Sequence, residues 1–226
     1  MFATSILLGV LVLPIYMFVR KDKDTKTEEA SSKPDEGFFQ TLKKLPVLAT
    51  ALCMASSLMC LTFKEPLLQI RLKELPVFVI GFIFSLDTIT YTLTSFCLNF
   101  IPEKDKDFKK LVAWGTCMYV FAMFGSGPIK LLPDSIEIIC IGILIGGIAG
   151  AFVNNNCVPS ISKYLSESGS KNTISAINTG AFGLGSILGP ILASFLDSHS
   201  DFRTSFTIAG CIVILIFCFQ VYTFKI

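Results

Sequence analysis

The chain has 226 residues, of which 52% are hydrophobic and only 16% are charged. Its 19 basic and 17 acidic residues lie mostly in short clusters between long apolar runs. This composition excludes a soluble globular domain and predicts an all-α protein that crosses a lipid bilayer about seven times. The basic residues lie at the ends of apolar segments, where membrane topology accounts for them, so the net charge of +2 does not indicate a nucleic-acid partner.

The first apolar segment covers residues 1–19, and basic residues follow it. This order is the reverse of a signal peptide, in which the charged region comes first. We therefore predict a transmembrane helix over residues 1–19 whose N-terminus is outside. Residues 20–44 carry mixed charges with Ser and Pro and have little to bury, which predicts a mobile cytoplasmic linker.

Six further apolar segments are each long enough to cross a bilayer. They cover roughly residues 45–63, 76–101, 111–132, 135–158, 173–196 and 204–224. Residues 45–226 are therefore expected to form one unit of six transmembrane helices. In this topology fourteen Lys and Arg residues lie on the cytoplasmic side and five lie opposite, in agreement with the positive-inside rule.

The segment over residues 173–196 is unusually rich in glycine. Its helix-weakening residues are Gly180, Gly183, Gly185, Gly189 and Pro190. Each glycine costs about 1 kcal/mol relative to alanine, so helix propensity does not explain them. In lipid, small residues let helix backbones approach closely, and Gly185 and Gly189 form a GxxxG pair with Pro190 directly behind it. We expect a kinked, closely packed helix that moves against a neighbour.

A second glycine-rich segment covers residues 135–158. Its glycines at 142, 146, 147 and 150 precede three consecutive asparagines at 154–156. We interpret these glycines as packing residues. The asparagines mark the cytoplasmic end of the predicted helix.

Asp87 lies about eleven residues into its apolar segment, near the middle of the bilayer. An acidic side chain there costs about 2.5 to 3.5 kcal/mol. On a helix Asp87 shares a face with Thr90, Tyr91 and Thr94, so it is predicted to face protein or water. Two interpretations are open: a cation or proton site in a cavity, or a structural carboxyl bonded to neighbouring hydroxyls.

Glu65 precedes Pro66 at the outer end of the segment that begins at residue 45. One interpretation is an interfacial acid paired with Lys64 or Arg71. If the helix continues to Leu72, Glu65 instead lies beside a proline kink and can face a central cavity.

Asn178 lies in the first half of the glycine-rich segment over residues 173–196. A buried amide needs hydrogen-bond partners. Either a neighbouring helix or a bound ligand would provide them.

The sequence shows no nucleophile beside a base, no metal-ligand spacing and no phosphate-binding loop. All eight cysteines lie in apolar segments without CxxC spacing, so we interpret them as packing or lipid-facing residues. We therefore predict a protein that is not an enzyme and that binds neither a cofactor nor a metal.

One helix, a charged linker and six more helices resemble the sixth helix onward of a major facilitator superfamily transporter, whose members have twelve helices in two halves. The loop over residues 99–111 resembles the acidic and basic signature of that family, with Asn99 at a position where glycine is common. Its matching residues are Glu103, Lys104, Lys109 and Lys110. The stretch Gly180–Leu196 resembles the glycine and Gly-Pro signature of proton-coupled antiporters.

Within this superfamily the sequence is most similar to the vesicular amine and polyamine transporter branch. The stretch FKEPL resembles an acid-proline element of that branch, which implies that Glu65 contacts a cation. The stretch DTITYTL resembles a helix in which a tyrosine, here Tyr91, faces the cavity. Asn178 and Asn154 stand at or near positions where amine transporters carry acids, and polyamine-type relatives also lack those acids.

The resemblance implies transport of a small cationic organic solute by alternating access, coupled to protons. Glu65, Asp87, Tyr91 and Asn178 would contact the solute or the proton. Because such a carrier needs two halves, we expect an incomplete transporter in the bilayer that a missing N-terminal half or a second chain completes. The alternative is a non-transporting membrane protein that binds or regulates a full-length transporter through its glycine-rich faces.

Overall fold

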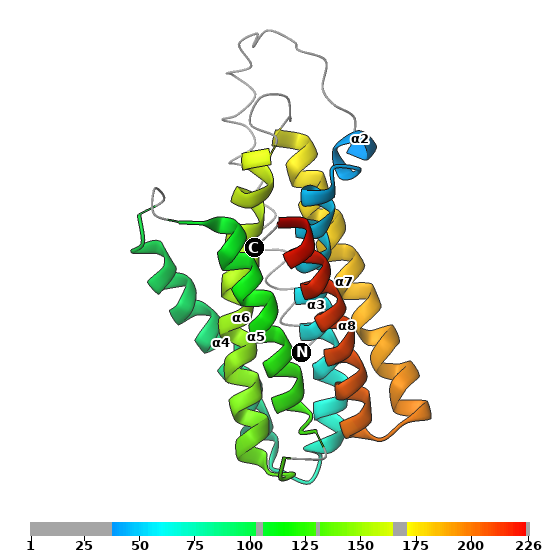
Figure 1. Ribbon diagram of the computed structural model, residues 1–226. Helices are drawn as coiled ribbons and strands as arrows, with labels where there is room; N and C mark the ends of the chain where they lie inside the picture. Colours follow the sequence, from blue (N-terminus) through cyan, green and yellow to red (C-terminus); the bar gives the residue numbers. More distant parts are fainter. Residues whose placement is uncertain (1–37, 103–105, 130–131, 165–170, 225–226) are drawn as a thin grey trace, which may run out of the picture. The chain divides into compact units, whose positions relative to one another are not determined.

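The computed structural model describes residues 38–102, 106–129, 132–164 and 171–224 (Figure 1). The predicted helix over residues 1–19 and most of the predicted linker lie outside the described residues. Glu103 and Lys104 of the predicted loop signature also lie outside them.

The described residues form seven α-helices and no strand. The helices are α2 (Phe38–Leu42), α3 (Leu45–Arg71), α4 (Val77–Asn99), α5 (Phe108–Ser126), α6 (Ile136–Tyr164), α7 (Lys171–His199) and α8 (Phe202–Phe224). Five of them, α3, α4, α6, α7 and α8, are long and apolar enough to cross a membrane. Helix α5 has 19 residues, which is within the length range of a transmembrane helix. The predicted all-α, multi-pass fold is confirmed.

Helix α3 extends beyond the apolar run from which it was predicted. It continues past Phe63, passes through Pro66 and ends at Arg71, where the backbone N–H of Leu72 donates to the carbonyl of Leu68. Leu67, Leu68 and Leu72 are almost completely buried, so the last turns of the helix are fixed by packing even though they contain charged residues. This extension brings Lys64 into the helix bundle.

Consecutive long helices run in opposite directions, so α5 and α6 pack antiparallel, whereas α4 packs parallel to α6 and α3 parallel to α7. Figure 1 shows α6 beside both α4 and α5, and α7 beside α3. Helix α3 also contacts α5, α6 and α8, so it lies at the centre of the packing. At the core the rings of Phe63 and Phe206 meet edge to face, with their centroids 5.3 Å apart.

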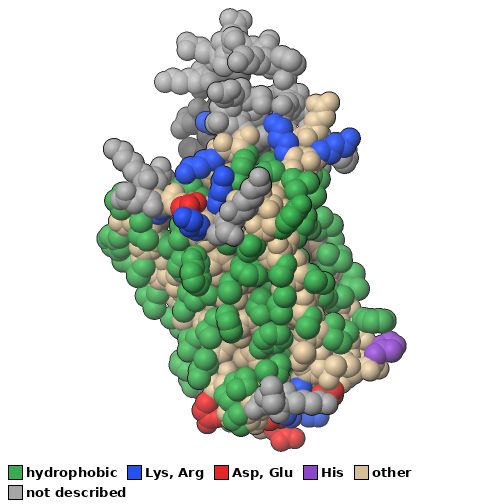
Figure 2. Space-filling view, in the orientation of Figure 1, with side chains coloured by type: hydrophobic (Ala, Val, Ile, Leu, Met, Phe, Trp, Pro, Cys, Tyr) green, Lys and Arg blue, Asp and Glu red, His purple; other side chains and the backbone are tan. Residues whose placement is uncertain are grey.

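Figure 2 shows hydrophobic side chains over the middle of the described helices and charged side chains at both of their ends. At the predicted outer end, Arg203 donates to the backbone carbonyls of Pro128, Ile129 and Leu132. At the opposite end, the ammonium group of Lys109 lies 4.5 Å from the centre of the Tyr164 ring. This distribution fits a bilayer around the central band.

The four glycines of α7 lie in two different environments. A Cβ at Gly185 would lie 2.3 Å from the carbonyl oxygen of Ala55, and one at Gly189 would lie 2.8 Å from that of Met59. Both glycines therefore pack against α3. A Cβ at Gly180 or Gly183 would meet no described atom within 4 Å. Of the predicted packing glycines of α7, only Gly185 and Gly189 lie at a contact with another described helix, and Pro190 directly follows Gly189.

Candidate functional site

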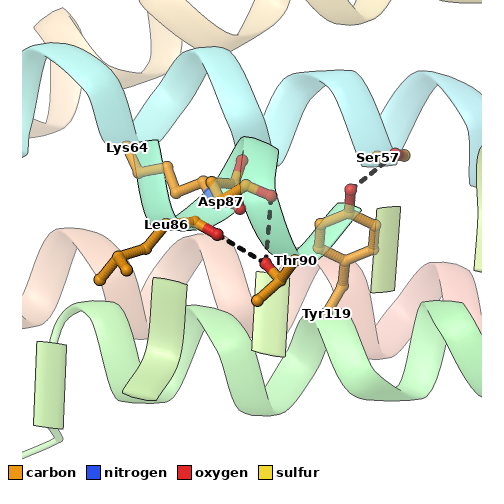
Figure 3. A network of polar contacts seen from close by, with 6 residues as sticks. All are labelled: Ser57, Lys64, Leu86, Asp87, Thr90 and Tyr119. Atoms are coloured by element: carbon orange, nitrogen blue, oxygen red, sulfur yellow. Dashed lines mark hydrogen bonds and ion pairs between the residues drawn. The ribbon is translucent and has the colours of Figure 1, made fainter. Parts of the chain in front are cut away.

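An ion pair lies between α3 and α4, well inside the predicted membrane span. The Lys64 Nζ atom donates to the Asp87 Oδ1 atom at 2.8 Å, and the two side chains are only 6% and 17% exposed. Figure 3 shows the lysine reaching along the helices to the carboxylate. Asp87 therefore faces protein, which is one of the two environments, protein or water, expected from its position in the sequence.

The hydroxyl beside Asp87 does not bond to its carboxylate. Thr90 Oγ1 donates to the backbone carbonyls of Leu86 at 2.7 Å and Asp87 at 3.1 Å (Figure 3). The interpretation of Asp87 as a carboxyl held by neighbouring hydroxyls therefore has no support from Thr90. The partner of the carboxylate is a lysine from another helix.

Helix α6 makes room for the ion pair because it has a glycine at the point of contact. A Cβ at Gly146 would lie 2.8 Å from Lys64 Nζ and 3.2 Å from Asp87 Oδ1. A Cβ at Gly147 would lie 2.3 Å from the carbonyl oxygen of Asp87. The glycine face of α6 thus brings the backbone of α4 close and leaves space for both charged side chains.

A chain of hydrogen bonds lies on the predicted cytoplasmic side of the ion pair. Ser57 Oγ donates to Asn154 Oδ1 at 3.0 Å, and the Tyr119 hydroxyl lies 2.8 Å from Ser57 Oγ (Figure 3). Because the single proton of Ser57 is used for Asn154, Tyr119 is the donor to Ser57. Three helices, α3, α5 and α6, contribute to this chain.

A second set of polar contacts joins α4 to α6 on the same side. The Tyr91 hydroxyl donates to Asn155 Oδ1 at 3.4 Å, and Asn155 Nδ2 donates to Ser95 Oγ at 2.8 Å. Tyr91 and Tyr119 both lie against Gly150 of α6. The asparagines predicted only to mark a helix end therefore hold polar partners on α3 and α4.

The other side of the ion pair is apolar. One or two turns toward the predicted outer end, the side chains are hydrophobic and at most 3% exposed: Leu67, Leu68, Ile83, Ile139 and Ile143. The ion pair therefore lies at the boundary between a polar and an apolar half of the helix packing. In this conformation its polar neighbours lead toward the predicted cytoplasmic end.

Two of the predicted site residues lie apart from the ion pair. Glu65 is exposed, and the two partners considered for it are used elsewhere, since Lys64 pairs with Asp87 and Arg71 with Asp134 at 2.5 Å. Asn178 lies on α7, where its Oδ1 atom is buried without a hydrogen-bond partner among the described residues. Among the described residues, neither Glu65 nor Asn178 forms a hydrogen bond or ion pair with Asp87 or Tyr91.

Sequence reasoning considered Lys64 only as a possible partner of Glu65 at the outer end of its segment and missed it as a site residue. The helical repeat indicates its environment once the helix is known to continue past Phe63. Cys60 and Leu68, four residues before and after Lys64, lie on the same helix face, and both are buried. A lysine on the core-facing stripe of a transmembrane helix requires a partner, and Asp87 is the intramembrane acid that supplies it.

Comparison with known proteins identifies the family to which this chain belongs. A model of the Major Facilitator Superfamily matches residues 66–225. The human protein "MFS-type transporter SLC18B1" is 23% identical over 221 residues, which cover 91% of this chain and 47% of that protein. The chain therefore spans about half the length of the curated relative that it matches. It belongs to the major facilitator superfamily.

Proposed function

We propose that this chain takes part in the transport of a small cationic organic solute across a membrane, and that the solute exchanges with a proton at the Lys64–Asp87 ion pair. The observation that carries this proposal is the buried ion pair inside a membrane-spanning packing of helices. Family membership and the name of the human relative, an MFS-type transporter, support transport as the general activity.

Stability does not explain why an ion pair is present at this position. Removing two charges from water costs more than their attraction usually returns, and a hydrophobic pair of similar size is often as stable. Charged groups inside a membrane most often mark ion or substrate pathways. A functional role therefore accounts for the pair better than packing does.

The chemistry of the pair favours a cation as the ligand. Asp87 is the anionic member of the pair, and the ammonium group of Lys64 already occupies the cation position beside its carboxylate. An organic ammonium ion can make the same contact with the carboxylate once Lys64 moves away. Lys64 is thus a competitor tethered to the site, and only a solute with a matching positive charge can replace it.

Replacement of Lys64 leads directly to proton coupling. If Lys64 left Asp87 and kept its charge, an unpaired ammonium would remain in a low-dielectric environment at a cost of several kcal/mol. Breaking one N–H bond of Lys64 and releasing that proton to water removes this cost and leaves a neutral amine. One ammonium group of the solute then replaces one proton at the site, and the Asp87 carboxylate keeps a single positively charged partner.

The surroundings offer a route for the proton. The ionisable side chains around the pair are Cys60 on α3, Tyr91 on α4 and Tyr119 on α5. On α6 the residue that lies against the pair is Gly146. Tyr119 connects through Ser57 to Asn154, toward the predicted cytoplasmic end. The apolar side chains on the other side of the pair offer no comparable route.

The test measures proton release by the purified full chain in detergent, in weak buffer with a pH-sensitive dye, as spermidine or tyramine is added. We expect saturable release by one or both amines. The variant Asp87→Asn should bind neither amine, whereas Lys64→Met should bind the amine without releasing a proton. Arg71→Gln is the matched control, because it breaks the exposed pair with Asp134 and should leave both properties unchanged.

A companion measurement follows amine uptake by vesicles that contain the full chain, with an imposed pH gradient. Uptake that an ionophore abolishes would support exchange with protons. If the protein is present at normal abundance but shows neither amine-induced proton release nor amine uptake, the proposal is overturned. Equal release by the Lys64→Met variant would show that Lys64 does not carry the proton.

A further inference from the structure

A groove runs between α5 and α8 on the surface of the described helices. Figure 1 shows these two helices side by side, and the groove encloses about 250 Å³ between them. Its lining is Lys110, Ala113, Trp114, Cys117, Phe217 and Val221. None of these residues belongs to the Lys64–Asp87 site.

The groove follows from side-chain sizes at regular helical spacing. On α5 its lining residues fall at positions i, i+3, i+4 and i+7, which form one face of the helix. Ala113 and Cys117 are small, so the space beside them stays open. Trp114, which is 65% exposed, forms a wall at the surface.

One end of the groove carries a positive charge, and the rest of its lining is apolar. Lys110 lies in the first turn of α5, and Val221 lies in the last turn of α8. Among the described residues Lys110 Nζ pairs with Asp107 at 3.4 Å, and both side chains are more than half exposed, at 63% and 51%. Such exposed pairs are weak, so Lys110 can bind another anion.

The position and size of the groove indicate the kind of ligand. Drug-sized pockets typically enclose about 300 to 1,000 Å³, so this groove suits a segment of a hydrocarbon chain better than a whole soluble ligand. Its charged end is the one predicted to face the cytoplasm, where membrane leaflets are rich in anionic lipids. Lys110 lies at the level where a lipid phosphate would meet it.

We propose that this groove binds one anionic phospholipid, with an acyl chain between α5 and α8 and its phosphate against Lys110. The apolar lining and the single cation match the two parts of such a molecule. This proposal does not depend on the transport proposal above.

The chain contains a single tryptophan, Trp114, and it lies in the groove, so its fluorescence reports on this site alone. The full chain is reconstituted in phosphatidylcholine vesicles with increasing amounts of brominated phosphatidylglycerol or brominated phosphatidylcholine, because bromine quenches nearby tryptophan. We expect the anionic lipid to reach half-maximal quenching at about fivefold lower mole fraction, the preference that one membrane-surface lysine provides.

Two variants and a matched control locate the site. Lys110→Gln should abolish the preference for the anionic lipid. Ala113→Leu should fill the groove and reduce quenching by phosphatidylglycerol to the level of phosphatidylcholine. Lys109→Gln should preserve the preference, because the ammonium group of Lys109 lies over the Tyr164 ring and is not part of the groove.

Each other outcome would overturn the proposal. Equal quenching by the two lipids in the unmodified chain would mean that ordinary boundary lipid covers the groove. Absence of quenching by either lipid would mean that protein covers it. A preference that persists in Lys110→Gln, or disappears in Lys109→Gln, would place the anion elsewhere.

Discussion

Helices α6 and α7 share a glycine-rich composition but lie in different environments. Each has 29 residues, several glycines and one internal proline. All four glycines of α6 at 142, 146, 147 and 150 are buried, and a Cβ at any of them would approach another helix within 3 Å. On α7 only Gly185 and Gly189 are buried, and Gly180 and Gly183 contact nothing among the described residues.

The comparison shows that a glycine pattern predicts a close helix contact without identifying what is in contact. On α6 the glycines meet three kinds of neighbour: helix backbone, uncharged side chains and the ion pair. On α7 half of the pattern meets α3 and half is open. Alanine substitutions distinguish these cases because each adds the same methyl group in a different environment.

The largest effect is expected at Gly142. A Cβ there would lie 2.2 Å from the backbone nitrogen of Ser126 and 2.5 Å from the carbonyl carbon of Gly125, so α5 itself would have to move. Overpacking of this kind typically costs about 1 to 3 kcal/mol. Gly142→Ala should therefore lower the melting temperature and the membrane abundance, measured by fluorescence size-exclusion chromatography after heating. Unchanged values would show that α5 and α6 are packed more loosely than the structure indicates.

A smaller loss is expected at Gly189. A Cβ there would lie 2.0 Å from the hydroxyl of Thr62, but 2.8 Å from the nearest backbone atom, the carbonyl oxygen of Met59. Thr62 can be shortened, whereas the backbone cannot. Gly189→Ala should therefore lower thermal stability, and the double variant Gly189→Ala with Thr62→Ala should recover part of the loss. Without any recovery, the backbone contact with Met59 would be the dominant cost.

Within the described residues the sequence predicted the membrane helices well, because long apolar segments and charged ends determine where helices cross a bilayer. It also predicted that Asp87 faces protein or water and not lipid, since an acid at mid-depth is costly in lipid. It missed Lys64 because the apolar run stops at Phe63, while the helix continues on the buried side chains of Leu67 and Leu68. Which helix supplies the partner of a charged residue depends on tertiary packing, and helical periodicity alone does not contain that information.

Gly146 should give a functional change with a modest cost in stability. The nearest atom to a Cβ at this position is Lys64 Nζ at 2.8 Å, the end of a flexible side chain, and not a backbone atom. The methyl group of Gly146→Ala should push Lys64 away from Asp87 and weaken the internal competitor. Amine-induced proton release should then occur at a lower amine concentration, by a few-fold. A fall in stability as large as that of Gly142→Ala would instead show that Lys64 cannot move.

The smallest effect is expected at Gly183, where an added Cβ would meet nothing within 4 Å among the described residues. Because alanine favours a helix by about 1 kcal/mol over glycine, Gly183→Ala should leave the purified chain unchanged or slightly more stable to heating. Gly180→Ala provides an independent replicate on the same open stretch of α7. A marked loss of stability in both variants would contradict the open environment and show that another protein segment packs there. The same substitutions therefore distinguish a lipid-facing glycine surface from one that a partner helix covers, which the glycine pattern alone does not resolve.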